Sequence, residues 1–370
     1  MYVVSLIFTL LLALMGATVL MRAVSENTLS TRSRSQYVAL HLAEAAVDRA
    51  AINLRTPTDL TDDVTSGTLP TGSFSINTPP TSVATNIWKI TAHGTAGSDT
   101  VNVEGVFRLT PQSIFQWAMF GDERITVSGN ATTDSYDSSL GVYGGANSGH
   151  DGDVGTNATT AGGVTVSGSI FVDGQIAVGP GVANPTTVVT GYDPSFITGT
   201  PKVVSMGTPV SMPSVTVPAG LTCNDYTVNG NTTTTLAPGT YCYHDLKLSG
   251  NSTLTSTGVV TIYLTGSLTA SGNSTFGVIN DPTKVTLLMT SNADATIDQG
   301  SVTGNSNFYG AIYGPDADFN ITGNAEIFGS IIAQRVTMSG NAYIHYDESL
   351  KNNTTVSTGG TTSLVYWKKL

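Results

Sequence analysis

Residues 1–21 read MYVVSLIFTLLLALMGATVLM, and this stretch decides the fold of the N-terminal part of the chain. It contains no charged residue, and the first charge is that of Arg22. At about 1.5 Å per residue, a helix of this length spans roughly 30 Å, enough to cross the apolar part of a bilayer. A secretory signal peptide carries Lys or Arg ahead of a shorter apolar run. In this chain the apolar run begins at residue 1 and the first positive charge follows it, as expected of a product whose basic leader has been removed before Met1.

The predicted helix continues well beyond the apolar run. No Pro occurs before Pro57, and between Arg22 and Arg55 apolar residues recur at helical spacing beside polar ones. The residue before a Pro avoids the α region, so the helix is expected to end near Pro57. We therefore predict one helix over residues 1–56, with a hydrophobic half (1–21) and an amphipathic half (22–56). Small residues form a surface in the second half where another element can pack closely: Ala43, Ala45, Ala46, Ala50 and Ala51.

The composition indicates a mostly β protein after the helix and excludes some partners. Only 11% of the 370 residues are charged, and Gly occurs 40 times. Gly and β-branched Thr are poor helix formers, whereas tight turns between short strands suit them. The formal net charge of −11 argues against a nucleic-acid partner, because phosphates need Lys and Arg.

Residues 57–120 predict a small β-meander. Residues 72–76 alternate, and residues 87–92 and 100–109 are strand-like, with a Gly-containing turn expected over His93–Asp99. The apolar face of this sheet needs a partner, and the amphipathic half of the helix is the expected one. Residues 112–120 are expected to form a short helix or a buried connector.

From residue 121 to residue 370 a unit recurs in which a Ser, Thr or Asn precedes Gly and then Asn or Ser. Successive units are spaced by about 20 residues and have short strands of alternating residues between them. This pattern favours the coils of a parallel β-helix. Each Gly-Asn is expected at a corner, and stacked corners would align the Asn side chains in a ladder. Seven Pro residues between 180 and 220 predict an extended excursion packed on the coils, or a surface for a neighbouring subunit. The apolar tail, residues 363–367, is expected to be a last strand that caps the β-helix or returns to the head. The repeats place their glycines at Gly129, Gly168, Gly230, Gly250, Gly272, Gly304, Gly323 and Gly340.

Two cysteines, Cys223 and Cys242, lie nineteen positions apart. In a chain that looks exported, one disulfide is the simplest prediction. Two buried free thiols are the alternative, and a metal site is less favoured because no CxxC or His pair accompanies the cysteines.

The N-terminal region, residues 1–54, resembles type IV pilin-like proteins of the PilX type. The resemblance rests on the run LLALMG at residues 11–16 and on AEAAVDRA at residues 43–50. It implies that prepilin peptidase cuts a leader before Met1, which becomes a methylated N-terminus, and that the pilus machinery assembles the chain. Most pilins have Glu at the fifth mature position, whereas this chain has Ser5, and no acidic residue precedes Glu26. The residues expected in a filament core are Val3, Val4, Ser5, Leu6, Phe8, Leu11, Leu12, Leu14, Met15 and Val19.

The remainder resembles the β-helical domain that often follows such N-termini, through GTY at 239–241, GAIYGP at 310–315 and SGNAYIHYDESL at 339–350. The predicted fold class is therefore α+β and mostly β. A long helix packs on a small antiparallel sheet, and a parallel β-helix follows.

Sites for chemistry are weakly indicated. Parallel β-helices include polysaccharide-active enzymes, whose sites need clustered carboxylates. The densest group here has no shared register: Asp294, Asp298, Asp316, Asp318 and Glu326, with Lys284 and Arg335 nearby. We expect no enzyme and no cofactor. Four carboxylates lie in loops of the kind that bind Ca²⁺, but their spacing fits no known calcium-binding motif. Capping of turns is therefore the favoured role of Asp134, Asp137, Asp151 and Asp153. His244 and His345 are expected to be structural.

The prediction is a structural subunit of an extracellular type IV pilus-like filament on a prokaryotic cell. It would be anchored in the inner membrane before assembly and would polymerise with other copies through its apolar half-helix. The alternatives are a low-copy minor or tip pilin or pseudopilin, acting in assembly or adhesion with other pilins, and a membrane-anchored β-helix enzyme.

Overall fold

The computed structural model describes residues 2–55, 65–290 and 300–370 of the chain. The chain forms two compact units, one made of residues 1–111 and 359–370 and the other of residues 112–358. The fold is mostly β: a long N-terminal helix packs on an antiparallel sheet, and a large, mostly parallel β structure follows. This is the predicted fold class.

Helix α1 (Tyr2–Asn53) is a single element of 52 residues. The predicted span was 1–56, of which Met1 and Thr56 lie outside the described residues. Only the second half of α1 has a buried face within its unit, at Ala39, Leu42, Ala43, Ala46, Val47, Ala50 and Ala51. Three of the five alanines predicted to form a packing surface, Ala43, Ala46 and Ala50, are completely buried, whereas Ala45 is exposed.

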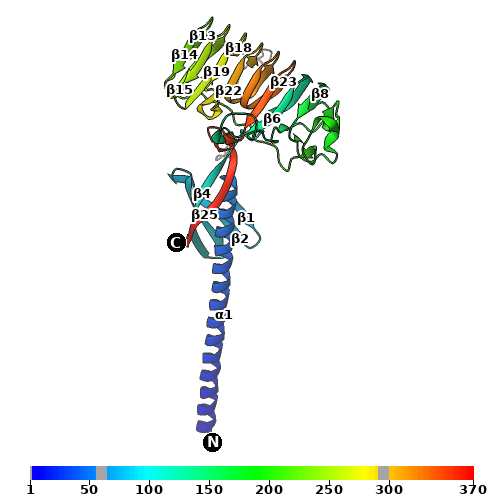
Figure 1. Cartoon of the computed structure of the whole chain (residues 1–370). Coiled ribbons are helices and arrows are strands. Elements are labelled where there is room, and N and C mark those ends of the chain that lie inside the picture. Colours follow the sequence, from blue (N-terminus) through cyan, green and yellow to red (C-terminus); the bar gives the residue numbers. More distant parts are fainter. Residues whose placement is uncertain (1, 56–64, 291–299) are drawn as a thin grey trace. The chain divides into compact units, whose positions relative to one another are not determined.

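A five-stranded sheet packs on this half of the helix (Figure 1). Its order is β1 (Ser66–Leu69), β2 (Gly72–Ala84), β3 (Ile87–Ala96), β4 (Asp99–Ser113) and β25 (Ser357–Lys369). Strands β1 to β4 are antiparallel neighbours. The apolar tail is therefore an edge strand of the head sheet. The tail returns to the head, which is one of the two placements predicted for it, and residues 359–370 belong to the compact unit of the head, whereas the predicted domain boundaries kept them with the β-helix.

The hairpin between β3 and β4 corrects the sequence prediction. The turn is Gly97-Ser98, and the expected turn over His93–Asp99 is wrong because β3 continues to Ala96. Gly94 lies in the strand directly under α1. A Cβ at this position would overlap the carbonyl oxygen of Ala39 and lie 2.6 Å from the amide nitrogen of Ala43. Glycine here permits close packing of helix on strand and does not reverse the chain.

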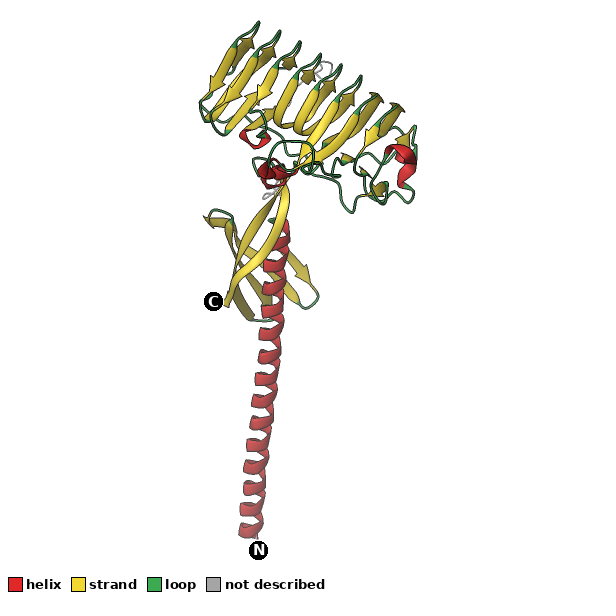
Figure 2. Ribbon diagram, viewed as in Figure 1, coloured by secondary structure: helices red, strands yellow, loops and turns green. Residues whose placement is uncertain are grey.

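The second unit is a stack of short strands, which we call the parallel stack (Figure 2). Every pairing between its named strands is parallel, as in β15 with β17 and β22 with β23. The strands are β5 (Met119–Gly129), β6 (Thr132–Tyr136), β7 (Val154–Thr156), β8 (Val164–Gly168), β9 (Phe171–Val172), β10 (Ile176–Val178), β11 (Val189–Thr190), β12 (Val203–Ser205), β13 (Asn224–Val228), β14 (Thr233–Leu236), β15 (Gly239–Leu248), β16 (Thr253–Ser256), β17 (Val260–Leu264), β18 (Leu268–Ala270), β19 (Thr275–Gly277), β20 (Val285–Met289), β21 (Gly300–Val302), β22 (Asn307–Ile321), β23 (Glu326–Met338) and β24 (Tyr343–Asp347).

Short 3₁₀ helices occur at η1 (Ser138–Leu140), η2 (Pro185–Val188), η3 (Pro194–Phe196), η4 (Pro282–Lys284) and η5 (Glu348–Asn352). The segment expected to be a short helix or a buried connector, residues 112–120, is a buried connector. It contains the end of β4, the irregular residues 114–118 and the start of β5, and Ile114, Phe115 and Ala118 are buried.

The chain enters the parallel stack in its middle. Strand β5 pairs with β23, and β6 pairs with β24, so the first and last coils lie side by side (Figure 1). From β5 the chain winds outward to β12, which pairs with β10. It then restarts at β13 and winds back to β24. Nothing in the repeat pattern had indicated this order.

The predicted corners are present. Gly272 and Gly304 have φ angles of +81° and +74°, and a Cβ on Gly304 would lie 2.7 Å from the carbonyl oxygen of Gly272. Beside them, Asn side chains donate to one another along the stack over 2.8–3.1 Å. The ladder contains Asn231, Asn251, Asn273, Asn305, Asn324, Asn341 and Asn130, in that spatial order. Interior side chains such as Ile125, Leu246 and Ile327 are fully buried between the strands.

The Pro-rich region is only partly an excursion. Strands β11 and β12 lie within residues 180–220 and pair with β8 and β10, so this part belongs to the stack. The segment after β12 packs Met206, Val210 and Met212 against buried residues of the same unit.

Cys223 and Cys242 form the predicted disulfide, which ties the segment before β13 to β15. We expect reduction, or Cys223→Ser with Cys242→Ser, to lower the free energy of unfolding of this end of the stack by about 3 kcal/mol, because a loop of this size is freed in the unfolded chain. Urea unfolding with and without reductant measures the change. An unchanged midpoint would show that the disulfide does not stabilise the stack.

Candidate assembly surface

The hydrophobic half of α1, residues 2–21, has no packing partner within its unit. All its large apolar side chains expose between 53% and 93% of their surface. By length and composition this segment is able to cross a membrane, and none of its most apolar window is buried. Apolar burial contributes about 25 cal/mol per Å², so a run of this length strongly favours either lipid or other apolar helices.

The two threonine hydroxyls in this half are bonded within the helix itself. Thr9 Oγ1 donates to the carbonyl oxygens of Ser5 and Leu6 at 3.0 and 2.9 Å, and Thr18 Oγ1 donates to that of Met15 at 2.8 Å. A threonine bonded in this way brings no unsatisfied donor into a dry environment. The segment is therefore compatible with lipid and with a packed core of helices.

The structure places the predicted core residues together on this segment. The large apolar ones, namely Val3, Val4, Leu6, Phe8, Leu11, Leu12, Leu14, Met15 and Val19, are all exposed, as is Ser5. Met1, the predicted processed N-terminus, lies outside the described residues. The first carboxylate along α1, that of Glu26, forms an exposed ion pair with Arg22 at 3.1 Å.

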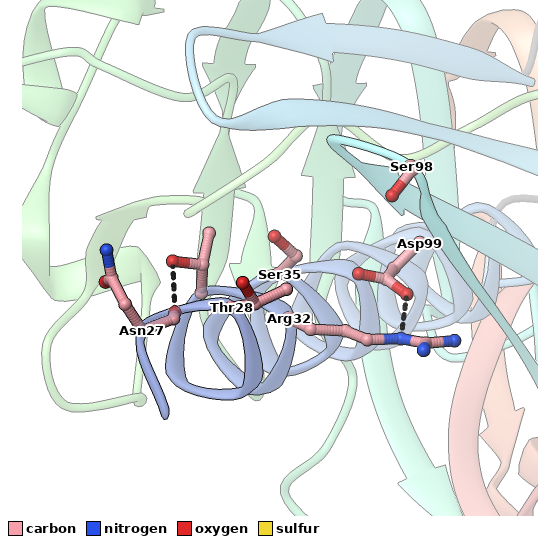
Figure 3. Close-up of a pocket in the computed structure, with 7 residues that line it drawn as sticks. Asn27, Thr28, Arg32, Ser35, Ser98 and Asp99 are labelled. Carbon is pink, nitrogen blue, oxygen red and sulfur yellow. Dashed lines mark hydrogen bonds and ion pairs between the residues drawn. The ribbon is translucent and has the colours of Figure 1, made fainter. Parts of the chain in front are cut away.

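A polar groove of about 400 Å³ lies where α1 meets the turn between β3 and β4 (Figure 3). Arg32 Nε approaches Asp99 Oδ1 at 3.6 Å across it. The remaining lining is uncharged: Asn27, Thr28, Thr31, Ser35 and Ser98. This set contains a single acid and a single base in contact with each other, which is a structural ion pair.

Strand β25 is held to β4 by a buried carboxylate. Tyr366 Oη donates to Glu104 Oε1 at 2.8 Å, and Lys368 Nζ lies 3.0 Å from the same oxygen. Hydrogen bonds from Lys368 and then Tyr366 lower the pKa of Glu104 below its ordinary value.

This contact predicts a pH dependence. Because the pKa of Glu104 is lower in the folded chain, its contribution to stability is complete above the ordinary Glu pKa and is lost as the pH falls through the lowered value. We expect the hydrogen-exchange protection factors of β25 amides to fall on acidification. Glu104→Gln should flatten that dependence, and a variant with the wild-type pH dependence would contradict the assignment.

The loop carboxylates weighed for Ca²⁺ are held by groups of the protein. Asp134 accepts from Tyr143 and contacts His345 Nδ1 at 2.6 Å, and Asp153 accepts from the amide of Gln175. Asp137 caps η1, and Asp151 pairs with Lys351 at 3.0 Å. Burial raises the pKa of Asp153.

The sequence shows His244 and Asp245 as adjacent potential metal ligands and favours a structural role for them, but it does not indicate that Asp225 joins them. Asp225 lies beside His244 and Asp245, with ligand atoms within 4.8 Å of one another. His244 Nδ1 lies 3.0 Å from Asp225 Oδ1, and the group is largely exposed. The parallel pairing of β13 with β15 brings residues twenty positions apart together, which no local motif could indicate.

The carboxylates weighed for catalysis do not converge in the described residues. Asp318 pairs with Arg335, which also contacts Glu123. Glu326 lies on β23 and Asp316 on β22, whereas Asp294 and Asp298 lie outside the described residues.

Comparisons with known proteins give the following similarities. Residues 242–353 match the family described as Domain of unknown function (DUF7305). No curated protein matches the chain. Among solved structures, the competence-associated pilin ComZ from Thermus thermophilus aligns at 11% identity over 91% of this chain and 97% of its own, with a TM-score of 0.29. The DUF3494 domain of Shewanella frigidimarina ice-binding protein 1 aligns at 13% identity over 63% of this chain and 95% of its own, with a TM-score of 0.26. Structural alignments this weak carry no argument about function.

Proposed function

We propose that this chain is a structural subunit of an extracellular type IV pilus-like filament and polymerises through the hydrophobic half of α1. The observation that carries the proposal is that every large apolar side chain of that half is exposed, in a chain whose other apolar residues are largely packed. Before assembly the segment lies in the inner membrane. After assembly it packs with the same segment of other copies, and prepilin peptidase and the pilus machinery are the partners in this process.

The second half of α1 supports the same proposal. A simple membrane anchor does not require a helix that continues for about thirty residues beyond the hydrophobic half and packs on a sheet. A rigid continuous helix, by contrast, fixes the orientation of each head relative to the polymerising segment. We infer that the parallel stack is the predicted β-helix and serves a structural rather than a catalytic role on the filament surface.

A second candidate is a low-copy minor or tip subunit. It is favoured by Ser5, which stands where most pilins have the Glu that pairs with a neighbour's amino terminus. Without that carboxylate an amino terminus in the filament core needs another acceptor, since an unpaired buried charge is costly. A subunit present in a single copy at the tip has no second copy of itself whose amino terminus needs that carboxylate.

Detergent removal tests the main proposal. The full chain purified from membranes in detergent is expected to sediment as filaments once the detergent is dialysed away. Monodisperse protein in detergent-free buffer would contradict it, and single copies at the ends of another pilin's filaments would favour the second candidate.

A further inference from the structure

A second groove lies on the other side of the helix–sheet contact, between α1, β4 and β25. It has a volume of about 280 Å³ and is lined by Glu44, Val47, Asp48, Phe107, Leu364 and Trp367. Val47 and Phe107 are buried, whereas Leu364 and Trp367 expose 57% and 40% of their surface. The groove therefore combines an apolar floor with two carboxylates supplied by the helix.

The negative charge of the two carboxylates is only partly balanced by contacts among the described residues. Glu44 and Asp48 are four residues apart on α1, a spacing at which like charges destabilise a helix. Glu44 contacts His41 at 3.0 Å. Across the described residues, Asp48 has neither an ion pair nor a hydrogen bond from its side chain. A cation bound in the groove would remove the repulsion.

The shape and chemistry of the groove select the kind of cation. An arginine side chain has an apolar stem that can cover Leu364 and Trp367, and a guanidinium that donates to two carboxylates at once. Its flat face also stacks favourably on an indole ring. An anion or a phosphate would leave both carboxylates unpaired, and a neutral sugar would donate hydroxyl hydrogen bonds without offsetting the repulsion between the two charges.

We propose that this groove receives an arginine from the basic segment of α1, Arg22–Arg34, of a second copy of the chain. This inference rests on the proposed function and names a contact within that filament. The segment carries Arg22, Arg32 and Arg34 and continues directly from the assembly surface. Arg34 is exposed and has no side-chain partner among the described residues. Arg22 forms an exposed ion pair with Glu26, whereas Arg32 is exposed but pairs with Asp99, of which only 12% is exposed. The groove carboxylates are negatively charged and the basic segment is positively charged. In the proposed filament they lie on the parallel α1 helices of two copies.

The contact fixes an axial offset between neighbours. The basic segment precedes the groove carboxylates along α1, and at about 1.5 Å per residue the separation corresponds to an offset of roughly 18 Å for Arg34 and roughly 36 Å for Arg22. The hydrophobic half is itself about 30 Å long, so an offset of roughly 18 Å leaves part of it against the same segment of the next copy, whereas an offset of roughly 36 Å places it against the second half of that copy's helix.

Charge reversal tests the proposal. Asp48→Arg is compared with Asp193→Arg, which makes the same charge change at an exposed site in the parallel stack, and circular dichroism checks that both variants fold. Asp48→Arg should lower the yield of sedimented filaments at least about tenfold, as expected for loss of a charge-assisted contact. The control should stay within about twofold. Three double variants then combine Asp48→Arg with Arg22→Glu, Arg32→Glu or Arg34→Glu. The yield of filaments should be restored in the double variant that reverses the arginine occupying the groove.

Two results would overturn the proposal: an Asp48→Arg yield equal to the control, or failure of all three reversals to restore it. Either result leaves the proposed function standing if the wild-type chain forms filaments. Absence of wild-type filaments contradicts the proposed function and this contact together.

Discussion

Replacing Leu11 by Asp is expected to abolish filament formation while leaving both compact units folded. Leu11 lies at the centre of the exposed hydrophobic half of α1, far from the buried face that begins at Ala39. An Asp at the middle of a membrane span costs about 3 kcal/mol on insertion scales, and an unpaired carboxylate in a core of helices costs several kcal/mol more. The amount of chain recovered in sheared, sedimented filaments measures the effect.

The matched control is Gln36→Asp, which adds the same charge to the same helix beyond both its hydrophobic half and the basic segment Arg22–Arg34. Gln36 is exposed. This variant should assemble like the wild-type chain. Normal filaments from Leu11→Asp would mean that the hydrophobic half is not the assembly element.

Replacing Gly94 by Val is expected to detach the second half of α1 from the head sheet. Any Cβ at this position overlaps the carbonyl oxygen of Ala39, and a rotamer change cannot relieve this because the two nearest atoms, that oxygen and the amide nitrogen of Ala43, belong to the backbone of α1. Helix and strand must separate, at a cost of about 3 kcal/mol or more. Hydrogen-exchange protection of the amides between Ala39 and Ala51 reports this directly.

Gly207→Val provides the comparison for Gly94. No heavy atom lies within 4 Å of a Cβ built on Gly207, so this substitution should change stability by no more than about 0.5 kcal/mol. Undiminished protection of α1 in Gly94→Val would show that the close approach of helix to strand does not hold the head together.

The features that the sequence predicted well are those set by local periodicity. Twenty uncharged residues followed by an amphipathic stretch without Pro define α1, and the position of its buried face follows from the alanines at helical spacing. The Gly-Asn corners were also predictable, since few residues adopt a positive φ as readily as Gly. The Asn ladder follows from stacking those corners in parallel register.

Long-range pairings were not predictable from the same patterns. Strand β5 pairs with β23 across about two hundred residues of sequence, and nothing in either strand specifies that neighbour. The group of Asp225 with His244 depends on one such pairing. Gly94 was misread because a glycine near the end of a strand suggests a turn when the helix above it is not yet known.

The candidate assembly surface was also only partly predictable from the sequence. The hydrophobic half of α1 can be recognised in the sequence, because a long run without charged residues is evident without knowledge of tertiary structure. The groove between α1 and β25 is not visible, because Trp367 and Asp48 meet only after the tail has joined the head sheet.

Cryo-electron microscopy of the assembled protein tests the central claim most directly. The proposed function predicts continuous filaments in which residues 2–21 of neighbouring copies pack together in a helical core, with the heads outside. The map would also show which group faces the amino terminus near Ser5. Filaments held together only by the heads, with the hydrophobic half of α1 outside the core, would contradict the account.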